Sequence, residues 1–373
     1  MDRRTDQLAR SANHTSRAVT AKVDRGHRVL VGVLCSFLCA LGCVGAAQDR
    51  AAALDAVVLP YVEKHAFMGS VLVARGDDIL LDKGYGSANL EWDVPNTPAT
   101  KFRLGSLTKQ FTAASILLLE ERGRLKIEDP INKYLPDAPP AWNGITIFHL
   151  LTHSSGVPNF TSFPEYKSIE PFPTTADKLV TSFRDKPLDF APGEKMSYSN
   201  SGYLVLGLLI EKLTGQSYSM FVKENIFTPL GMNDSGYDSN SVIIPHRASG
   251  YSPLGTTLTN AGFIHMTVPH AAGALYSTTG DLLKWTRGLF GGKVITAASL
   301  QKMTTPYKNS YAFGLVVRDD NGRRTISHNG GIEGFNTTLL YHPDQKVTVA
   351  VLANVNGAAP QDIAVKLAAL AVK

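Results

Sequence analysis

The spacing of the apolar residues changes twice along this chain of 373 residues. Toward both ends apolar and polar residues alternate, as in "GSVLVARGDDILLDKGYG" and "FNTTLLYHPDQKVTVAVLAN", and this alternation is typical of strands paired in hairpins. Between about residue 104 and residue 271 the apolar residues recur at helical spacing and are separated by loops rich in Pro and Gly. These patterns predict an α+β fold with one antiparallel sheet built from both chain ends, terminal helices that flank the sheet, and an inserted all-helical subdomain.

Turn residues and changes of period place the individual elements. Gly76-Asp77-Asp78, Asn321-Gly322 and Pro343-Asp344 are expected at hairpin turns, and Asn-Gly is the strongest of these signals. The sheet part is expected at about residues 50–103 and 272–373, and the helical subdomain at about 104–271. The expected helices are residues 51–67, Gln110–Glu121, Ile147–Thr152, Gly202–Leu213, Tyr218–Ile226 and Asp362–Val372. Residues 155–175 contain four Pro and four aromatic residues, so we expect a loop that walls or covers a groove.

Residues 1–47 have the composition of an export signal. Seven basic and three acidic residues lie in residues 1–28, and Val29–Gln48 has no charge and ends in "CVGAAQ". A positive segment, an apolar segment and small residues at the end are typical of a secretory signal peptide, here cleaved near Ala46 or Ala47. The apolar run is also long enough to span a bilayer, so an uncleaved anchor stays open, as does lipidation at Cys43. We expect residues 48–373 to form one periplasmic or secreted domain.

Charge and cysteine content limit the partners and the stabilising bonds of this domain. The whole chain carries 37 basic and 32 acidic residues, and 30 and 29 remain without residues 1–47. A nearly neutral domain offers no strongly basic surface, so we expect no nucleic-acid partner. The three cysteines, Cys35, Cys39 and Cys43, all lie in residues 1–47. The mature domain is therefore expected to fold without disulfides and to depend on its apolar core.

The stretch "RLGSLTKQFTAASILLLEERGRL" (residues 103–125) places a hydroxyl and an ammonium at the start of an apolar helix. Ser106 and Lys109 are three residues apart, so they share one helix face with Cβ atoms roughly 5–6 Å apart. A serine hydroxyl becomes a good nucleophile only when a neighbouring base takes its proton. The helix N-terminus also favours negative charge that develops on a substrate oxygen. The same Ser-x-x-Lys pattern recurs at Ser299 and Lys302, so the pattern needs support from elsewhere in the chain.

Two further stretches supply that support. "PGEKMSYSNSGY" places Tyr198 and Asn200 in a loop just before the helix expected from Gly202, and "ISHNGGIEGF" places His328 and Gly331 at the end of an expected strand. With these motifs and blocks such as "ITIFHLLTHSSGVPNF", "PLGMNDSGY" and "AAGALYSTTGDLLKWTRGL", the chain from about residue 55 to its end resembles the serine β-lactamase and D,D-peptidase superfamily. It is most similar to the branch of class C β-lactamases, D-alanyl-D-alanine carboxypeptidases and related esterases. This resemblance implies a β-lactamase/transpeptidase-like fold.

The resemblance also implies a role for each motif residue. Ser106 would be the nucleophile, Lys109 its base, and Tyr198 the group that passes the proton to the leaving group and later helps to activate water. Lys109 can accept a proton only if it is partly neutral, which requires burial or nearby positive charge. Asn200 would hydrogen-bond the amide of the acyl side chain. The backbone N–H groups of Ser106 and Gly331 would form the oxyanion hole.

The third motif, His328-Asn329-Gly330-Gly331, is expected to bind the substrate, because its glycines let a substrate backbone lie against the strand edge. β-Lactamases of this branch usually have Lys at the place of His328, whereas the His-x-Gly form is similar to some D,D-peptidases and D-aminopeptidases. A histidine with the ordinary pKa of about 6.5 loses its charge near neutrality. We therefore expect His328 to be a pH-dependent cation for a substrate carboxylate.

The sequence predicts an exported serine hydrolase that forms an acyl-enzyme on Ser106 and uses no cofactor and no metal. Its expected substrates are D-alanyl peptides and the β-lactams that imitate them. A carboxylesterase on short acyl esters is the alternative within the same chemistry, and a penicillin-binding regulatory module with slow turnover is the alternative of another class. His149 and His153 could face a metal from one helix, but no HExxH glutamate accompanies them. Gly-x-Ser-x-Gly does not occur, which argues against an α/β-hydrolase.

Overall fold

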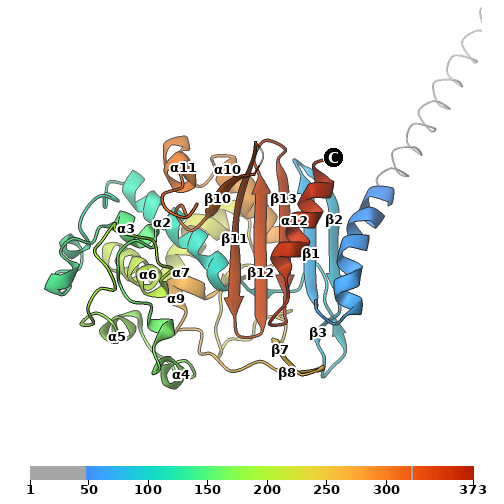
Figure 1. Ribbon diagram of the computed structural model, residues 1–373, viewed down its shortest axis with the longest axis horizontal. Coiled ribbons are helices and arrows are strands. Elements are labelled where there is room, and N and C mark those ends of the chain that lie inside the picture. Colours follow the sequence, from blue (N-terminus) through green and yellow to red (C-terminus); the bar gives the residue numbers. More distant parts are fainter. Residues whose placement is uncertain (1–47, 321) are drawn as a thin grey trace, which may run out of the picture. The chain divides into compact units, whose positions relative to one another are not determined.

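The computed structural model of the protein describes residues 48–320 and 322–373 (Figure 1). The chain divides into a first unit, residues 1–53, and a second unit, residues 54–373. In the first unit the described residues, 48–53, are helical. The predicted signal peptide at residues 1–47, its three cysteines and the turn residue Asn321 lie outside the described residues.

A six-stranded antiparallel sheet lies at the centre of the second unit, and both chain ends supply its strands (Figure 1). The strand order is β10-β11-β12-β13-β1-β2. β1 (Gly69–Arg75) pairs with β13 (Val347–Ala353), and Val71 lies opposite Val351. This pairing joins the N-terminal hairpin to the C-terminal strands, as the alternating patterns predict. The other strands of this sheet are β2 (Asp78–Tyr85), β10 (Val316–Asp320), β11 (Arg323–Ile332) and β12 (Phe335–His342).

The two faces of the sheet bury different layers, because neighbouring side chains on a strand point to opposite faces. Val71 and Val73 pack with the helix at residues 54–63 and with α12 (Pro360–Ala371). Leu72 instead joins the larger core that contains the central helices. The terminal helices therefore cover one face, and the inserted part of the chain together with the helix at Thr279–Phe290 covers the other.

The central helix of the inserted part is α2 (Thr108–Glu121). Every residue from Thr108 to Leu119 is buried, including the polar Lys109 and Gln110. α6 (Asn200–Thr214) packs against α2 and ends at Gly215. The remaining helices are α3 (Ile147–Leu151), α4 (Tyr166–Ile169), α5 (Ala176–Thr181), α7 (Tyr218–Val222), α8 (Thr228–Leu230), α9 (His270–Gly273), α10 (Thr279–Phe290) and α11 (Ala297–Thr304).

Residues 104–271 are not purely helical, contrary to the expected all-helical subdomain. β6 (Gly236–Tyr237) joins β5 (Phe102–Arg103) and β9 (Leu275–Ser277) in a small sheet. Strands this short carry too little alternation to be recognised in a sequence. The other short strands pair two by two: β3 (Ser87–Asn89) with β4 (Val94–Pro95), and β7 (Tyr251–Leu254) with β8 (Thr257–Asn260).

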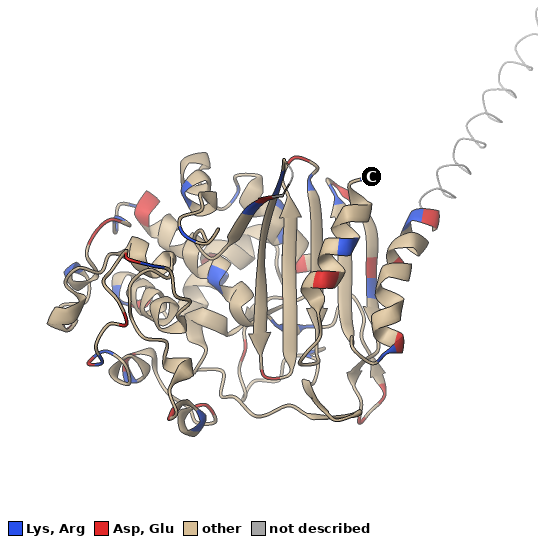
Figure 2. Cartoon of the chain, viewed as in Figure 1, with Lys and Arg blue, Asp and Glu red and all other residues tan. Residues whose placement is uncertain are grey.

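Basic and acidic residues are interspersed along the helices and loops of the described chain (Figure 2). This mixture agrees with the nearly equal numbers of basic and acidic residues after residue 47. Within residues 48–320 and 322–373, none of the helices has the length and apolar composition needed to cross a membrane.

Candidate active site

Ser106 lies in η1 (Gly105–Leu107), a single 3-10 turn that runs directly into α2. Gly105 has a φ of 54°, and a Cβ atom there would lie 2.8 Å from the backbone nitrogen of Gly331 on β11. Glycine is therefore required both by the left-handed backbone and by the close approach of the two segments. This approach brings Ser106 and Gly331 into the wall of one pocket.

The ammonium end of Lys109 is enclosed by oxygen atoms. Lys109 has 0% of its surface exposed. Its Nζ lies 2.9 Å from Ser106 Oγ, 2.8 Å from Asn200 Oδ1 and 2.8 Å from the carbonyl oxygen of Ala272. Burial lowers the pKa of Lys109 well below its ordinary value, because the charged form loses its hydration.

These three contacts fit a neutral amine. A neutral amine has two N–H donors and one lone pair, whereas an ammonium has three donors and no acceptor. Asn200 Oδ1 and the Ala272 carbonyl can only accept, so they take the two N–H groups. The lone pair then faces Ser106 Oγ, and the arrangement allows Lys109 to accept the hydroxyl proton of Ser106.

Tyr198 stands beside this pair, with its ring centre 4.8 Å from Lys109 Nζ. Although 36% of Tyr198 is exposed, its phenol is desolvated enough to raise its pKa, and a hydrogen bond with the Ser106 hydroxyl partly offsets this effect. Asn200 is the first residue of α6 rather than a loop residue. Its Nδ2 donates to Thr161 Oγ1 at 3.1 Å, so the amide is oriented with its oxygen toward Lys109.

The rings of Tyr311 and of His153, which the sequence suggested only as a possible metal ligand, pack around Tyr198. The ring centre of His153 lies 4.2 Å from that of Tyr198 and 4.6 Å from that of Tyr311. His153 Nδ1 accepts a hydrogen bond from the backbone N–H of Ser199 at 3.2 Å. Burial lowers the pKa of His153 well below its ordinary value. His153 is thus a neutral packing partner.

His328 is buried behind these rings, and both of its ring nitrogens are occupied. Nδ1 lies 2.6 Å from the carbonyl oxygen of Asn329, and Nε2 lies 3.1 Å from the hydroxyl of Tyr311. The first contact needs a hydrogen on Nδ1, so Nε2 accepts from Tyr311. Burial and the neighbouring Lys109 lower the pKa of His328 to about 4. The expectation that His328 gains and loses its charge near its ordinary pKa of about 6.5 is therefore wrong.

Asn329 and Gly330 do not face the pocket. Asn329 Nδ2 donates to Gln361 Oε1 at 2.6 Å, and Gln361 belongs to α12, which covers the opposite face of the sheet. Alternation along β11 turns this side chain away, so the expected substrate contact of Asn329 is wrong. A Cβ at Gly330 would lie 1.9 Å from the carbonyl oxygen of Leu104. Gly330 therefore serves the approach of β11 to the segment before Ser106.

A pocket of about 220 Å³ opens at Ser106. Phe160, Thr161 and Tyr166, all from the loop expected to wall a groove, lie in its wall. Of the described residues that line the pocket, none is Lys or Arg. The other lining residues are Gly105, Asn200, Ile264, Pro269, Ala272, Gly273, Gly331, Ile332 and Glu333. Glu333 lies two residues after Gly331, the last residue of the third motif. It was not identified from the sequence as part of the site.

Residues 54–373 match the sequence pattern of the Beta-lactamase family. The chain belongs to the β-lactamase family. Proteins of similar sequence and similar structure are consistent with this family. Penicillin-binding protein 4* of Bacillus subtilis (strain 168) is 33% identical over 315 residues, which cover 78% of this chain and 69% of that protein.

Two solved structures place this β-lactamase-family chain among serine hydrolases that resemble penicillin-binding proteins. The penicillin binding protein from Bacillus halodurans has a TM-score of 0.78 at 27% identity and covers 85% of this chain and 98% of its own. The D-stereospecific amidohydrolase from Streptomyces sp. has a TM-score of 0.70 at 25% identity, covering 80% and 92%. The protein is a serine hydrolase of the β-lactamase family.

The second Ser-x-x-Lys pattern of this β-lactamase-family chain has no catalytic surroundings. Lys302 Nζ pairs with Glu120 Oε2 at 2.9 Å, and Ser299 Oγ accepts from Thr296 Oγ1 at 3.3 Å. Ser299 is buried at the start of α11, where its backbone N–H is capped by Thr296. Both side chains are therefore used in local structure.

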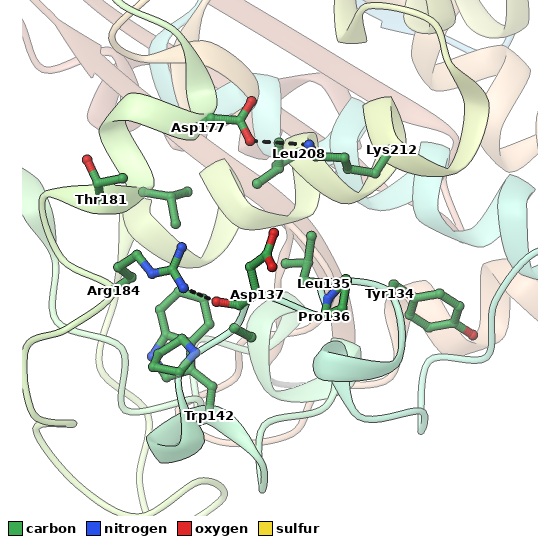
Figure 3. A pocket seen from close by; sticks show the side chains of 13 residues that line it. Tyr134, Leu135, Pro136, Asp137, Trp142, Asp177, Thr181, Arg184, Leu208 and Lys212 are labelled. Atoms are coloured by element: carbon green, nitrogen blue, oxygen red, sulfur yellow. Dashed lines mark hydrogen bonds and ion pairs between the residues drawn. The ribbon is translucent and has the colours of Figure 1, made fainter.

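Another cavity, of about 260 Å³, lies beside Trp142 (Figure 3). Lys212 pairs there with Asp177 at 3.4 Å, and the Arg184 guanidinium donates to the backbone carbonyl of Asp137. It holds none of the expected catalytic residues. Among the residues that the structure describes, no group of three or more His, Cys, Asp or Glu is placed to hold a metal ion.

Proposed function

We propose that Ser106 forms an acyl-enzyme with D-alanyl peptides and with the β-lactams that imitate them. The observation that carries this proposal is the arrangement at Lys109. Two fixed acceptors, Asn200 Oδ1 and the Ala272 carbonyl, occupy the two N–H groups of a neutral amine and leave its lone pair 2.9 Å from Ser106 Oγ. A base whose ordinary pKa is far above neutrality is thereby kept ready to accept a proton.

The steps of the reaction follow from the neighbours of Ser106. Ser106 Oγ attacks the carbonyl carbon while its proton passes to Lys109 Nζ. The backbone N–H groups of Ser106 and Gly331 hold the oxygen that becomes negative. Tyr198, which stays protonated because its pKa is raised, relays the proton to the leaving group, and the reverse relay activates water for deacylation. No cofactor takes part in these steps.

Short neutral esters are the second candidate substrates, and the state of His328 favours them. D-Ala-D-Ala peptides and penicillins end in a carboxylate, for which a cation is the natural partner. His328 is neutral near pH 7 because its pKa is lowered to about 4. The described lining residues include no Lys or Arg. The pocket therefore offers no cation to a terminal carboxylate, and substrates without that carboxylate have no charge left unpaired.

One assay separates these candidates. The purified protein is given nitrocefin, a D-Ala-D-Ala peptide and p-nitrophenyl butyrate side by side, and kcat/KM is compared. We expect turnover of the peptide or the β-lactam to exceed that of the ester. Preferential turnover of the ester would replace the proposal with the carboxylesterase. Stoichiometric acylation without turnover would replace it with a penicillin-binding regulatory module.

We also propose that the protein acts outside the cytoplasm, either in the periplasm or after secretion. The support is the basic segment followed by the uncharged run Val29–Gln48, which is typical of a signal peptide. In that location the partner is a small molecule or a peptide of the peptidoglycan type, and no nucleic acid. Membrane contact would come only from an uncleaved leader or a lipid on Cys43.

A further inference from the structure

A carboxyl group in the wall of the Ser106 pocket has a second, buried carboxyl group beside it. Glu333 lies in the turn between β11 and β12 and lines the pocket. Glu170 follows α4 directly and is only 4% exposed. It lies close enough to Glu333 for the two carboxyl groups to shift each other's pKa. The turn that follows the oxyanion strand and the loop that walls the pocket thus contribute one acid each.

The charges around this pair are unbalanced. Lys167 Nζ donates to Glu170 Oε2 at 2.8 Å, whereas Glu170 Oε1 is buried and receives no N–H or hydroxyl hydrogen bond among the described residues. Burial and the hydrogen bond with Glu170 raise the pKa of Glu333 to about 7. Burial alone would raise the pKa of Glu170. The interactions with Glu333 and Lys167 outweigh burial, so the pKa of Glu170 is lowered. Tyr166 is the remaining titratable group that faces both acids, and its raised pKa keeps it neutral.

Two states of the pair result. When Glu333 holds a proton, it donates to Glu170, and the group of Glu170, Glu333 and Lys167 is neutral. When Glu333 is ionised, the group carries one negative charge that faces a pocket lined by no Lys or Arg among the described residues. A cation in the pocket would replace the shared proton and balance that charge.

The position of Glu333 indicates which part of the substrate it meets. Along β11, His328 lies three residues before Gly331 and packs near Tyr198, with ring centres 6.3 Å apart. Tyr198 is the proposed proton donor to the leaving group. Glu333 lies two residues beyond Gly331, on the other side of the proposed oxyanion hole. The acids therefore belong to the side of the pocket that holds the acyl part of the substrate.

We propose that Glu333, supported by Glu170, binds an ammonium group on the acyl part of the substrate, so that this hydrolase prefers aminoacyl over neutral acyl groups. This inference rests on the proposed acyl-enzyme function of Ser106. It narrows the substrates to D-aminoacyl amides, peptides or esters with a free amine. A charge-assisted hydrogen bond of this kind corresponds to about a ten- to a hundredfold preference in kcat/KM.

The test compares p-nitrophenyl esters that differ only in an ammonium or a methyl group. One pair is D-alanyl against isobutyryl, and the other is 3-aminopropanoyl against butanoyl, with spontaneous hydrolysis subtracted. We expect the aminoacyl ester of at least one pair to be preferred about tenfold or more. Glu333→Gln keeps the shape of the side chain and removes its charge, so it should abolish the preference by lowering kcat/KM for the aminoacyl esters more than for the neutral esters.

Glu165→Gln is the matched control, because it makes the same change on an exposed residue of the same loop. It should keep the preference. The preference for the 3-aminopropanoyl ester, whose amine stays charged, should rise between pH 6 and pH 8 as Glu333 loses its proton, and it should be flat in Glu333→Gln. Glu170→Gln should shift the rise to lower pH, because it removes the acceptor that raises the pKa of Glu333.

Two further measurements distinguish failure of the ammonium site from failure of the proposed acyl-enzyme function. A fluorophosphonate label on Ser106 and turnover of the butanoyl ester report whether the acyl-enzyme chemistry works. If both are present and neither aminoacyl ester is preferred, or if Glu333→Gln lowers only thermal stability and leaves the preference unchanged, the ammonium site is refuted while the hydrolase stands. If the label and the turnover are both missing, the proposed function fails, and the ammonium site fails with it.

Discussion

Nζ of Lys109 lies 2.8 Å from Oδ1 of Asn200. This contact is between a buried amine and an uncharged amide, and its neutrality matters because a carboxylate in the same place would hold Lys109 in its ammonium form. Asn200 therefore does more than the substrate contact implied by the family resemblance. Asn200 accepts a hydrogen bond from one N–H of Lys109 without adding a negative charge, which would keep Lys109 protonated and unable to act as a base.

Asn200→Asp tests this relationship with almost no change of shape. The new carboxylate should raise the pKa of Lys109, so the acidic limb of kcat/KM against pH should move upward by about one unit or more. On the acidic limb, each unit of this shift corresponds to about a tenfold loss of kcat/KM, which is recovered at higher pH. Asn329→Asp makes the same chemical change on the other face of β11, where the side chain bonds to Gln361, and should leave the profile in place. An unmoved acidic limb in Asn200→Asp would show that Lys109 is not the titrating base.

His328 should make the fold sensitive to acid. Its pKa is lowered from 6.5 to about 4 in the folded state, so between these pH values the unfolded chain binds a proton that the folded chain does not. The contribution of neutral His328 to the free energy of unfolding is fully present above pH 6.5. It falls by roughly 3 kcal/mol as the pH decreases toward 4. Urea denaturation at pH 7.0 and 4.5 should show a smaller loss for His328→Gln than for the wild type. His246→Gln, at an exposed histidine, should retain the wild-type loss, and equal losses in all three proteins would contradict the neutral His328.

Gly105 should be irreplaceable because of its neighbour Gly331 and not only because of its backbone angle. Gly105 and Gly123 have φ values of 54° and 68°, but a Cβ at Gly123 meets nothing within 4 Å. Gly123→Ala should therefore cost only the strain of a left-handed residue, about 1–2 kcal/mol, with activity intact. Gly105→Ala should add about 1–3 kcal/mol of overpacking and lower kcat/KM, because it pushes Ser106 away from Gly331. Thermal melts and ester turnover of the two variants check this; identical behaviour would mean that the close approach is unimportant.

The strands and the central helices were predictable because their periods are long and regular. β13 is buried along its whole length, and β1 pairs with it as the alternation predicts. Boundaries were less predictable: the helix expected from Gly202 begins at Asn200, and the helix expected at Tyr218–Ile226 is α7 followed by a π-helical turn at Lys223–Phe227. A shift of one turn at such an end leaves the apolar pattern unchanged.

The candidate site was predictable where a residue acts through its place in a motif, and not where it acts through burial. Ser106, Lys109, Tyr198, Asn200 and Gly331 come together around one pocket or its base. The charge of His328 could not be read from the sequence, because it depends on burial in the folded chain and on contacts with Tyr311 and Lys109. The orientation of Asn329 depends on strand register, and the pairing of Glu170 with Glu333 depends on contact between residues far apart in the chain.

Export should leave a new N-terminus. The leader, which lies outside the described residues, is expected to be cut near Ala46 or Ala47, so mass spectrometry of the protein from its native envelope should find a start at Ala47 or Gln48. A retained leader would indicate a membrane anchor instead. A diacylated N-terminal Cys43 would convert the prediction to a lipoprotein.

Covalent labelling tests the role of Ser106 most directly. A fluorescent penicillin or a fluorophosphonate is added to the wild type, to Ser106→Ala and to Ser299→Ala, and the labelled peptide is mapped by mass spectrometry. We expect one label on Ser106 in the wild type, an unchanged label in Ser299→Ala, and none in Ser106→Ala, whose turnover should fall by roughly a millionfold. A label that persists in Ser106→Ala and maps to another residue would contradict the account.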